Sequence, residues 1–164
     1  MPTEIEDYPD VRDKLNDLGC RTPSEFAILP VNFEAAESID EFRQASEAAT
    51  LKTLFRSEDI PYDEILEETE KPPYTQNNAF EWVAPTLFVS AAIVVENPTY
   101  VTIALNVVSN YATDFFKGIY GDNEVSMGIV VESSEEKKCK RISYEGPPEG
   151  LEDLDSVVKE ICEN

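Results

Sequence analysis

Four small polar side chains recur along an uncharged stretch and form the most site-like pattern in the sequence. They are Thr102, Asn106, Ser109 and Thr113, and their spacing of three or four residues would place them along one stripe of a helix. Ligand pockets combine apolar walls with a few convergent polar groups. The stripe therefore predicts contact with a ligand or partner at these four residues. The alternative is that it reaches solvent or hydrogen-bonds to helices near the N-terminus.

Carboxylate pairs suggest a metal site, but they are numerous enough to arise by chance. Asp63 and Glu67, and likewise Glu64 and Glu68, lie four residues apart on a predicted helix and would bind Mg²⁺ or Ca²⁺ weakly. A specific site for these cations needs oxygen ligands that converge from several elements. We therefore interpret the pairs as a solvated face and predict neither a metal site nor a cofactor.

One basic cluster interrupts the acidic sequence, at residues 137–141 (KKCKR). It would hold a phosphate or an acidic peptide, but it directly follows Glu135 and Glu136, so local charge pairing is the preferred interpretation. Cationic neighbours would also lower the pKa of the Cys139 thiol. No base or partner thiol accompanies this cysteine, which argues against a reactive role.

The chain lacks the residues and motifs that are typical of common enzymes. It contains no histidine, which removes the commonest general base and every histidine-containing triad. The glycine-rich nucleotide motifs and the nucleophile-elbow motif are also absent from the sequence. We predict no catalytic residues, and the sequence favours a non-enzymatic protein over an enzyme.

Acidic residues dominate the charge. The chain has 34 Asp and Glu against 13 Lys and Arg, for a formal net charge of −21. Such a surface repels nucleic-acid phosphates and anionic lipid headgroups, so we predict no direct binding to nucleic acid. A basic partner protein is the natural complement. An acidic coat also keeps a protein hydrated in a salt-rich cytoplasm, and the sequence leaves both explanations open.

The cysteines and the N-terminal residues indicate a cytoplasmic protein. Cys20, Cys139 and Cys162 are odd in number and widely spaced, without the spacing of a zinc or redox motif. We expect them to be reduced thiols. The first ten residues, MPTEIEDYPD, have neither the basic nor the apolar segment of a signal peptide.

A long apolar block occupies the middle of the sequence. Between Trp82 and Thr113 the only charged residue is Glu96, which divides the block into runs at 82–95 and 97–113. Each run is shorter than the about 20 residues that a membrane-spanning helix needs. The block therefore predicts a buried core. A membrane hairpin is the competing interpretation.

The clearest predicted element is a helix over residues 98–117. Asn97 suits the N-cap, Pro98 suits the first helical position, and Gly118 closes the other end. Apart from the polar stripe, every face of this helix is apolar, which predicts burial over most of its circumference.

The remaining elements of the C-terminal half follow from shorter patterns. Residues 87–95 favour a buried strand over a helix that starts at Pro85. Alternation at 125–132 and 139–144 predicts a hairpin, and 151–162 reads as an amphipathic helix. A right-handed crossover would make strand 87–95 parallel to 125–132, with both helices on one face of the sheet.

The N-terminal half reads as mainly helical. Helices are predicted over 9–18, from Ser38 to about Arg56, and from Pro61 onward, while 26–33 is either helical or extended. Residues 71–81 contain prolines and asparagines that interrupt every period, which predicts a linker. The expected fold is α+β. It has a helical region at 1–70 and a core at 82–164 with a small three-stranded sheet (strand-helix-strand-strand-helix), both in one compact unit.

These observations lead to three hypotheses of different classes. The first is a soluble, acidic, non-enzymatic interaction protein, such as an adaptor, a regulator or an immunity-type subunit, that binds a basic partner protein. The second is a small-ligand binder or enzyme with a pocket beside helix 98–117. The third is a membrane-active effector that uses residues 82–116.

Overall fold

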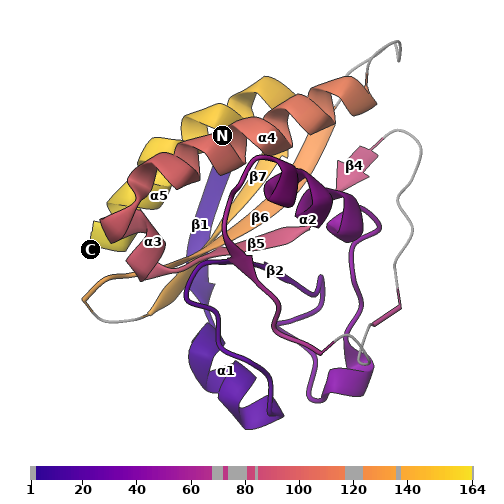
Figure 1. Ribbon diagram of the computed structural model, residues 1–164, viewed down its shortest axis with the longest axis vertical. Helices are drawn as coiled ribbons and strands as arrows, with labels where there is room; N and C mark the ends of the chain where they lie inside the picture. Colours follow the sequence, from indigo (N-terminus) through magenta and orange to yellow (C-terminus); the bar gives the residue numbers. More distant parts are fainter. Residues whose placement is uncertain are drawn as a thin grey trace.

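The computed structural model describes residues 3–67, 72–73, 81–83, 85–116, 124–135 and 138–163, with only the backbone described at 81–83. These residues form a mixed β-sheet with helices packed against it, and α4 and α5 lie across one face (Figure 1). The strands are β1 (Thr3–Tyr8), β2 (Phe26–Leu29), β3 (Tyr62–Asp63), β4 (Glu81–Val83), β5 (Thr86–Val89), β6 (Glu124–Glu132) and β7 (Cys139–Gly146). The α-helices are α1 (Val11–Leu18), α2 (Ala48–Ser57), α3 (Ala91–Glu96), α4 (Pro98–Phe115) and α5 (Leu154–Glu163).

The sheet is larger than the sequence suggested. Seven strands of the described residues join in it, in the order β1-β7-β6-β5-β2-β3, with β4 paired to β6. The predicted three-stranded sheet and the predicted helical N-terminal region are therefore wrong. The first 67 residues contribute three strands. One of them, β1, pairs antiparallel with β7, which lies far away in the sequence.

The central topology matches the prediction. Strand β5 is parallel to β6, and β6 forms an antiparallel hairpin with β7. Helix 98–117 is confirmed as α4, Pro98–Phe115, although Asn97 stands at its N-cap without a side-chain capping bond. Residues 117–123 lie outside the described part of the chain.

The choice between strand and helix at 87–95 has a mixed outcome. Residues Thr86–Val89 form β5, and Ala91–Glu96 form α3. Ser90 separates the two because its Oγ accepts the backbone N–H of Ile93, which is an N-cap bond. The predicted strand is thus correct only for residues 87–89.

Two predicted helices of the N-terminal half differ from the structure. The segment from Ser38 to Arg56 holds only a short 3₁₀ turn at Ile39–Glu41 before α2 begins at Ala48. The residues after Pro61 form β3 rather than a helix, because Tyr62 and Asp63 pair with β2. The predicted linker at 71–81 falls mostly outside the described residues and stays a prediction.

Apolar clusters fill both faces of the sheet. The larger cluster lies under α4 and α5 and includes Val108, Ile129 and Val158. The smaller one lies on the opposite face, where Val11 and Leu15 of α1 pack with their neighbours. Alternate residues of a strand point to opposite faces, which explains how β6 serves both clusters.

The apolar block forms part of this core. Within the described ranges, no helix is long and apolar enough to cross a membrane. Val108 is fully buried, and Phe115 is half-buried against the larger cluster.

Candidate functional site

The polar stripe of α4 faces other parts of the protein. Thr102 Oγ1 donates to Asp155 Oδ2 at 2.8 Å, and Ser109 Oγ donates to the carbonyl of Pro148 at 2.9 Å. Thr113 Oγ1 donates to the carbonyl of Ser109 at 2.9 Å, within the same helix. Asn106 is half-buried. The contacts run to α5 and to the turn before it rather than to N-terminal helices, and ligand or partner binding by the stripe stays a prediction.

The carboxylate pairs near β3 have local partners. Asp63 Oδ2 accepts the backbone N–H groups of Ser24 and Glu25, at 2.8 and 3.1 Å. Glu64 lies 2.7 Å from Lys52 Nζ, and Glu67 forms a loose pair with Arg21. Among the residues that the structure describes, no group of three or more metal-ligating side chains converges.

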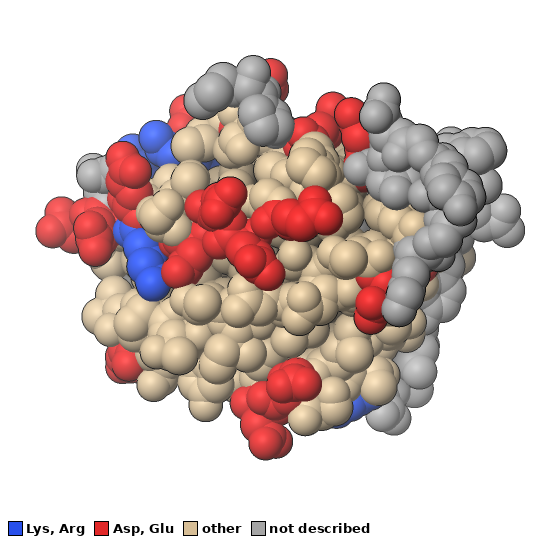
Figure 2. Space-filling view, turned by 90° about the horizontal axis from the view of Figure 1, so that it is seen from above, with Lys and Arg blue, Asp and Glu red and all other residues tan. Residues whose placement is uncertain are grey.

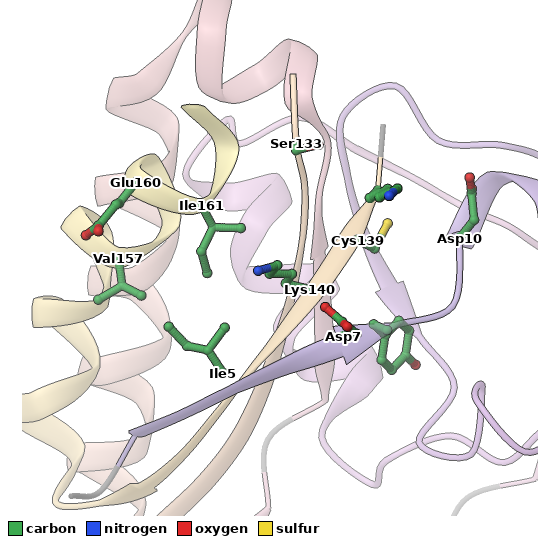
Figure 3. A pocket seen from close by; sticks show the side chains of 11 residues that line it. Ile5, Asp7, Asp10, Ser133, Cys139, Lys140, Val157, Glu160 and Ile161 are labelled. Carbon is green, nitrogen blue, oxygen red and sulfur yellow. The ribbon is translucent and has the colours of Figure 1, made fainter. Parts of the chain in front are cut away.

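A groove lies beside the edge of the sheet. It encloses about 860 Å³ and is bounded by β1, the start of β7 and α5 (Figure 3). Its walls combine apolar and charged side chains from three elements that are far apart in the sequence. This separation explains why the sequence patterns missed it.

The apolar part of the groove lies between β1 and α5. Ile5 projects from β1 toward Val157 and Ile161 of α5 (Figure 3). Ile5 is 50% exposed, whereas Ile161 is only 7% exposed. The groove thus leaves a large apolar side chain half uncovered on an otherwise acidic strand.

The polar end of the groove contains both signs of charge. Lys140 stands opposite Asp7 in the β1–β7 register, and Lys138 and Asp10 line the same end. Ser133, 6% exposed, also lines it, and its Oγ has no hydrogen-bond partner among the described residues. A buried hydroxyl without a partner is costly, so this end is suited to a polar atom of an occupant.

The groove does not activate Cys139. Cys139 is a free thiol that packs in the smaller core cluster with Val11. Burial raises the pKa of the Cys139 thiol to about 11, and this outweighs the lowering effect of Arg12. The sequence-based expectation that cationic neighbours lower this pKa is therefore wrong, because desolvation disfavours the thiolate.

A partly buried ion pair lies at the end of β6. Glu132, the last residue of β6, accepts Nε of Arg12 at 2.5 Å and Nη2 of Arg12 at 3.1 Å. It also accepts the backbone N–H of Ala91, the first residue of α3, at 3.0 Å. Nothing in the sequence distinguishes Glu132 from the other acidic residues, because its burial and its partners depend on the fold.

A second, smaller hollow lies between α2 and the β2–β3 end of the sheet. It encloses about 470 Å³. Its basic side chains have partners within the protein, since Lys52 pairs with Glu64 and Arg56 Nη1 donates to the Tyr62 hydroxyl at 2.8 Å. These contacts give the basic side chains of the second hollow a structural role.

The charged side chains on the molecular surface are mainly acidic. In Figure 2 the acidic side chains form several clusters with few basic side chains between them, separated by a broad uncharged band. Glu132 is the one acidic side chain that is buried in the described part of the chain.

Comparison with protein-family models, curated proteins and solved structures finds no match to this chain. Its function therefore has to be argued from the surface and the groove themselves.

Proposed function

We propose that this is a non-enzymatic interaction protein that binds a basic partner protein through its acidic surface. The observation that carries the proposal is the placement of the acidic side chains. Apart from Glu132, those of the described residues lie at the surface. A field of this sign attracts a basic partner over a distance and speeds its association.

The internal ion pairs leave most of this charge uncompensated. Those in the described part of the chain join Arg12, Arg21, Lys52 and Lys159 to acidic side chains. With 34 acidic and 13 basic residues in the sequence, even complete pairing of every base would leave an excess of 21 acids. A partner with an opposite excess would neutralise this surface.

Affinity purification from the native host at low salt, followed by reconstitution with the purified partner, tests the proposal. We expect one dominant basic protein in a fixed ratio, with an affinity that falls as salt screens the charges. A preparation that stays free of partners, or a partner whose binding is independent of salt, would contradict it.

A further inference from the structure

Strand β1 presents an open edge. It ends the strand order, and β7 is its only partner strand among the described residues. In an antiparallel edge strand, every second residue points its backbone N–H and C=O away from the neighbouring strand. An extended segment from another chain would find these groups unpaired.

The two faces of this edge differ in chemistry. Ile5 and Asp7 point toward the groove, where Val157 and Ile161 form the opposite wall. Glu4 and Glu6 point to the other face, because side chains alternate along a strand. Both glutamates are exposed, and neither forms an ion pair within the described residues, although Arg141 stands opposite Glu6 in the β1–β7 register.

We propose that β1 is a docking edge that takes up an extended segment of the partner with alternating apolar and basic side chains. The segment adds to the sheet as a further strand. Its apolar side chains enter the groove over Ile5 and Val157, and its basic side chains face Glu4 and Glu6. The basic character of the segment rests on the proposed function above.

Charge decides against a second copy of this chain as the occupant. Pairing β1 with β1 of another molecule would bring Glu4, Glu6 and Asp7 of both copies together, and like charges across a strand pair are destabilising. Charged side chains commonly protect sheet edges in this way. An edge strand that is only protected against pairing would not need a half-exposed apolar side chain beside a groove. Strand β1 has both, in Ile5 and the groove next to it.

The polar end of the groove limits where the segment carries its charges. Lys138 and Lys140 offset Asp7 and Asp10 there, so this end has no excess of acidic side chains to attract a basic side chain of the segment. We therefore place the basic side chains on the Glu4 and Glu6 face and uncharged side chains in the groove.

A capped heptapeptide of alternating Lys and Val is the first probe, titrated at low salt and followed by fluorescence anisotropy. Its control has the same composition with the valines in one block. We expect the alternating peptide to bind at least about tenfold more tightly, because only it separates apolar and basic faces. Equal affinity of the two peptides would overturn the proposal.

Backbone methylation of the peptide tests strand addition without any change to the protein. One version carries N-methyl groups on the valines and the other on the lysines. Only one of these sets points its N–H groups at β1, so we expect one version to lose about tenfold in affinity while the other is nearly unaffected. Equal effects of the two modifications would overturn strand addition.

Protein variants locate the contact. We expect Glu4→Lys/Glu6→Lys to weaken binding of the alternating peptide by about tenfold or more. The matched control, Asp17→Lys/Glu58→Lys, makes the same change in net charge at exposed positions on α1 and after α2, and should change affinity less than about twofold. Equal losses would show that the overall field, and not β1, attracts the peptide, and would overturn the docking edge.

These outcomes separate the two proposals. If the peptide series fails while a basic partner still binds in a salt-dependent way, the docking edge is wrong and the proposed function stands. If the alternating peptide binds as described but no basic partner is recovered, the edge stands and the proposed function is contradicted.

Discussion

The carboxylate of Glu132 is held by the guanidinium of Arg12, and this contact joins the end of the central strand β6 to α1. Glu132 is 1% exposed and Arg12 is 32% exposed, so the pair lies at the margin of the core. Because Glu132 also accepts the Ala91 N–H at the start of α3, one carboxylate fixes two helices against the sheet.

Removing the guanidinium should therefore destabilise the fold. We expect Arg12→Met to lower the free energy of unfolding by about 3 kcal/mol, because it leaves a buried carboxylate without its partner. Arg21→Met is the matched control, since its pair with Glu67 is largely exposed and should contribute less than about 1 kcal/mol. Urea denaturation measures both values. Equal, small effects would show that Glu132 is adequately solvated without Arg12.

We expect the Cys139 thiol to be unreactive in the folded protein. Raising its pKa from 9.0 to about 11 lowers the thiolate fraction near neutral pH by about a hundredfold. In the native state at about pH 8, we expect Ellman's reagent to modify the half-buried Cys20 first and Cys139 only after unfolding. Mass spectrometry of partly labelled protein identifies the sites. Early labelling of Cys139 would show that its burial is incomplete.

Stability should fall at alkaline pH. Burial raises the pKa values of Tyr8 and Tyr111 to about 12, and the hydrogen bond to Glu47 adds to the effect at Tyr111. Because the folded state holds these protons more tightly than the unfolded state, the associated stability is complete below about pH 9 to 10. It is lost as the pH rises toward 12.

Urea midpoints measured between about pH 8 and pH 11 test this dependence. We expect the midpoint to decline over the upper part of this range, and to decline less steeply in Tyr111→Phe. A midpoint that stays constant or rises with pH would contradict the assignment of these tyrosines.

Two residues of the α4 stripe should respond differently to loss of their hydroxyls. Ser109→Ala removes a buried hydrogen bond to Pro148 and should cost about 1–2 kcal/mol, because the carbonyl loses its donor. Thr113→Val removes a bond within the helix at an exposed residue and should cost less than about 0.5 kcal/mol. Thermal and urea unfolding compare the two variants. A ligand-dependent rise in stability that either variant abolishes would instead favour the small-ligand hypothesis.

Gly150 leaves room for the Tyr144 hydroxyl. A Cβ at position 150 would lie 2.0 Å from that hydroxyl, which donates to the Pro147 carbonyl at 2.6 Å. We expect Gly150→Ala to cost about 1–3 kcal/mol through this overlap. In the Tyr144→Phe background, the added cost of the alanine should be smaller, which a double-mutant cycle in urea measures. If the alanine costs the same in both backgrounds, its overlap with the Tyr144 hydroxyl is not the cause of the destabilisation.

The sequence predicted the elements whose signals are local. Pro98 and the long uncharged run after it define α4, and the alternation in β6 and β7 defines the hairpin. The helix predicted over 9–18 is α1, which Gly19 ends with the positive φ of 76° that glycine tolerates.

The missed elements depend on contacts between distant residues. Strand β1 is mostly exposed at the sheet edge, so its acidic residues show no buried face for a pattern to reveal. Strand β2 is short and buried at every position, and a run of four apolar residues does not distinguish strand from helix. The groove and the Arg12–Glu132 pair each need elements that meet only in the folded chain.

The pairing of β1 with β7 also constrains how the protein is made. Thr3 pairs with Tyr144, so β1 must wait for the synthesis of about 140 further residues before it can pair with β7. During that interval its apolar and acidic faces are open to other proteins. The sheet can therefore be completed at this edge only after β7 has been synthesised.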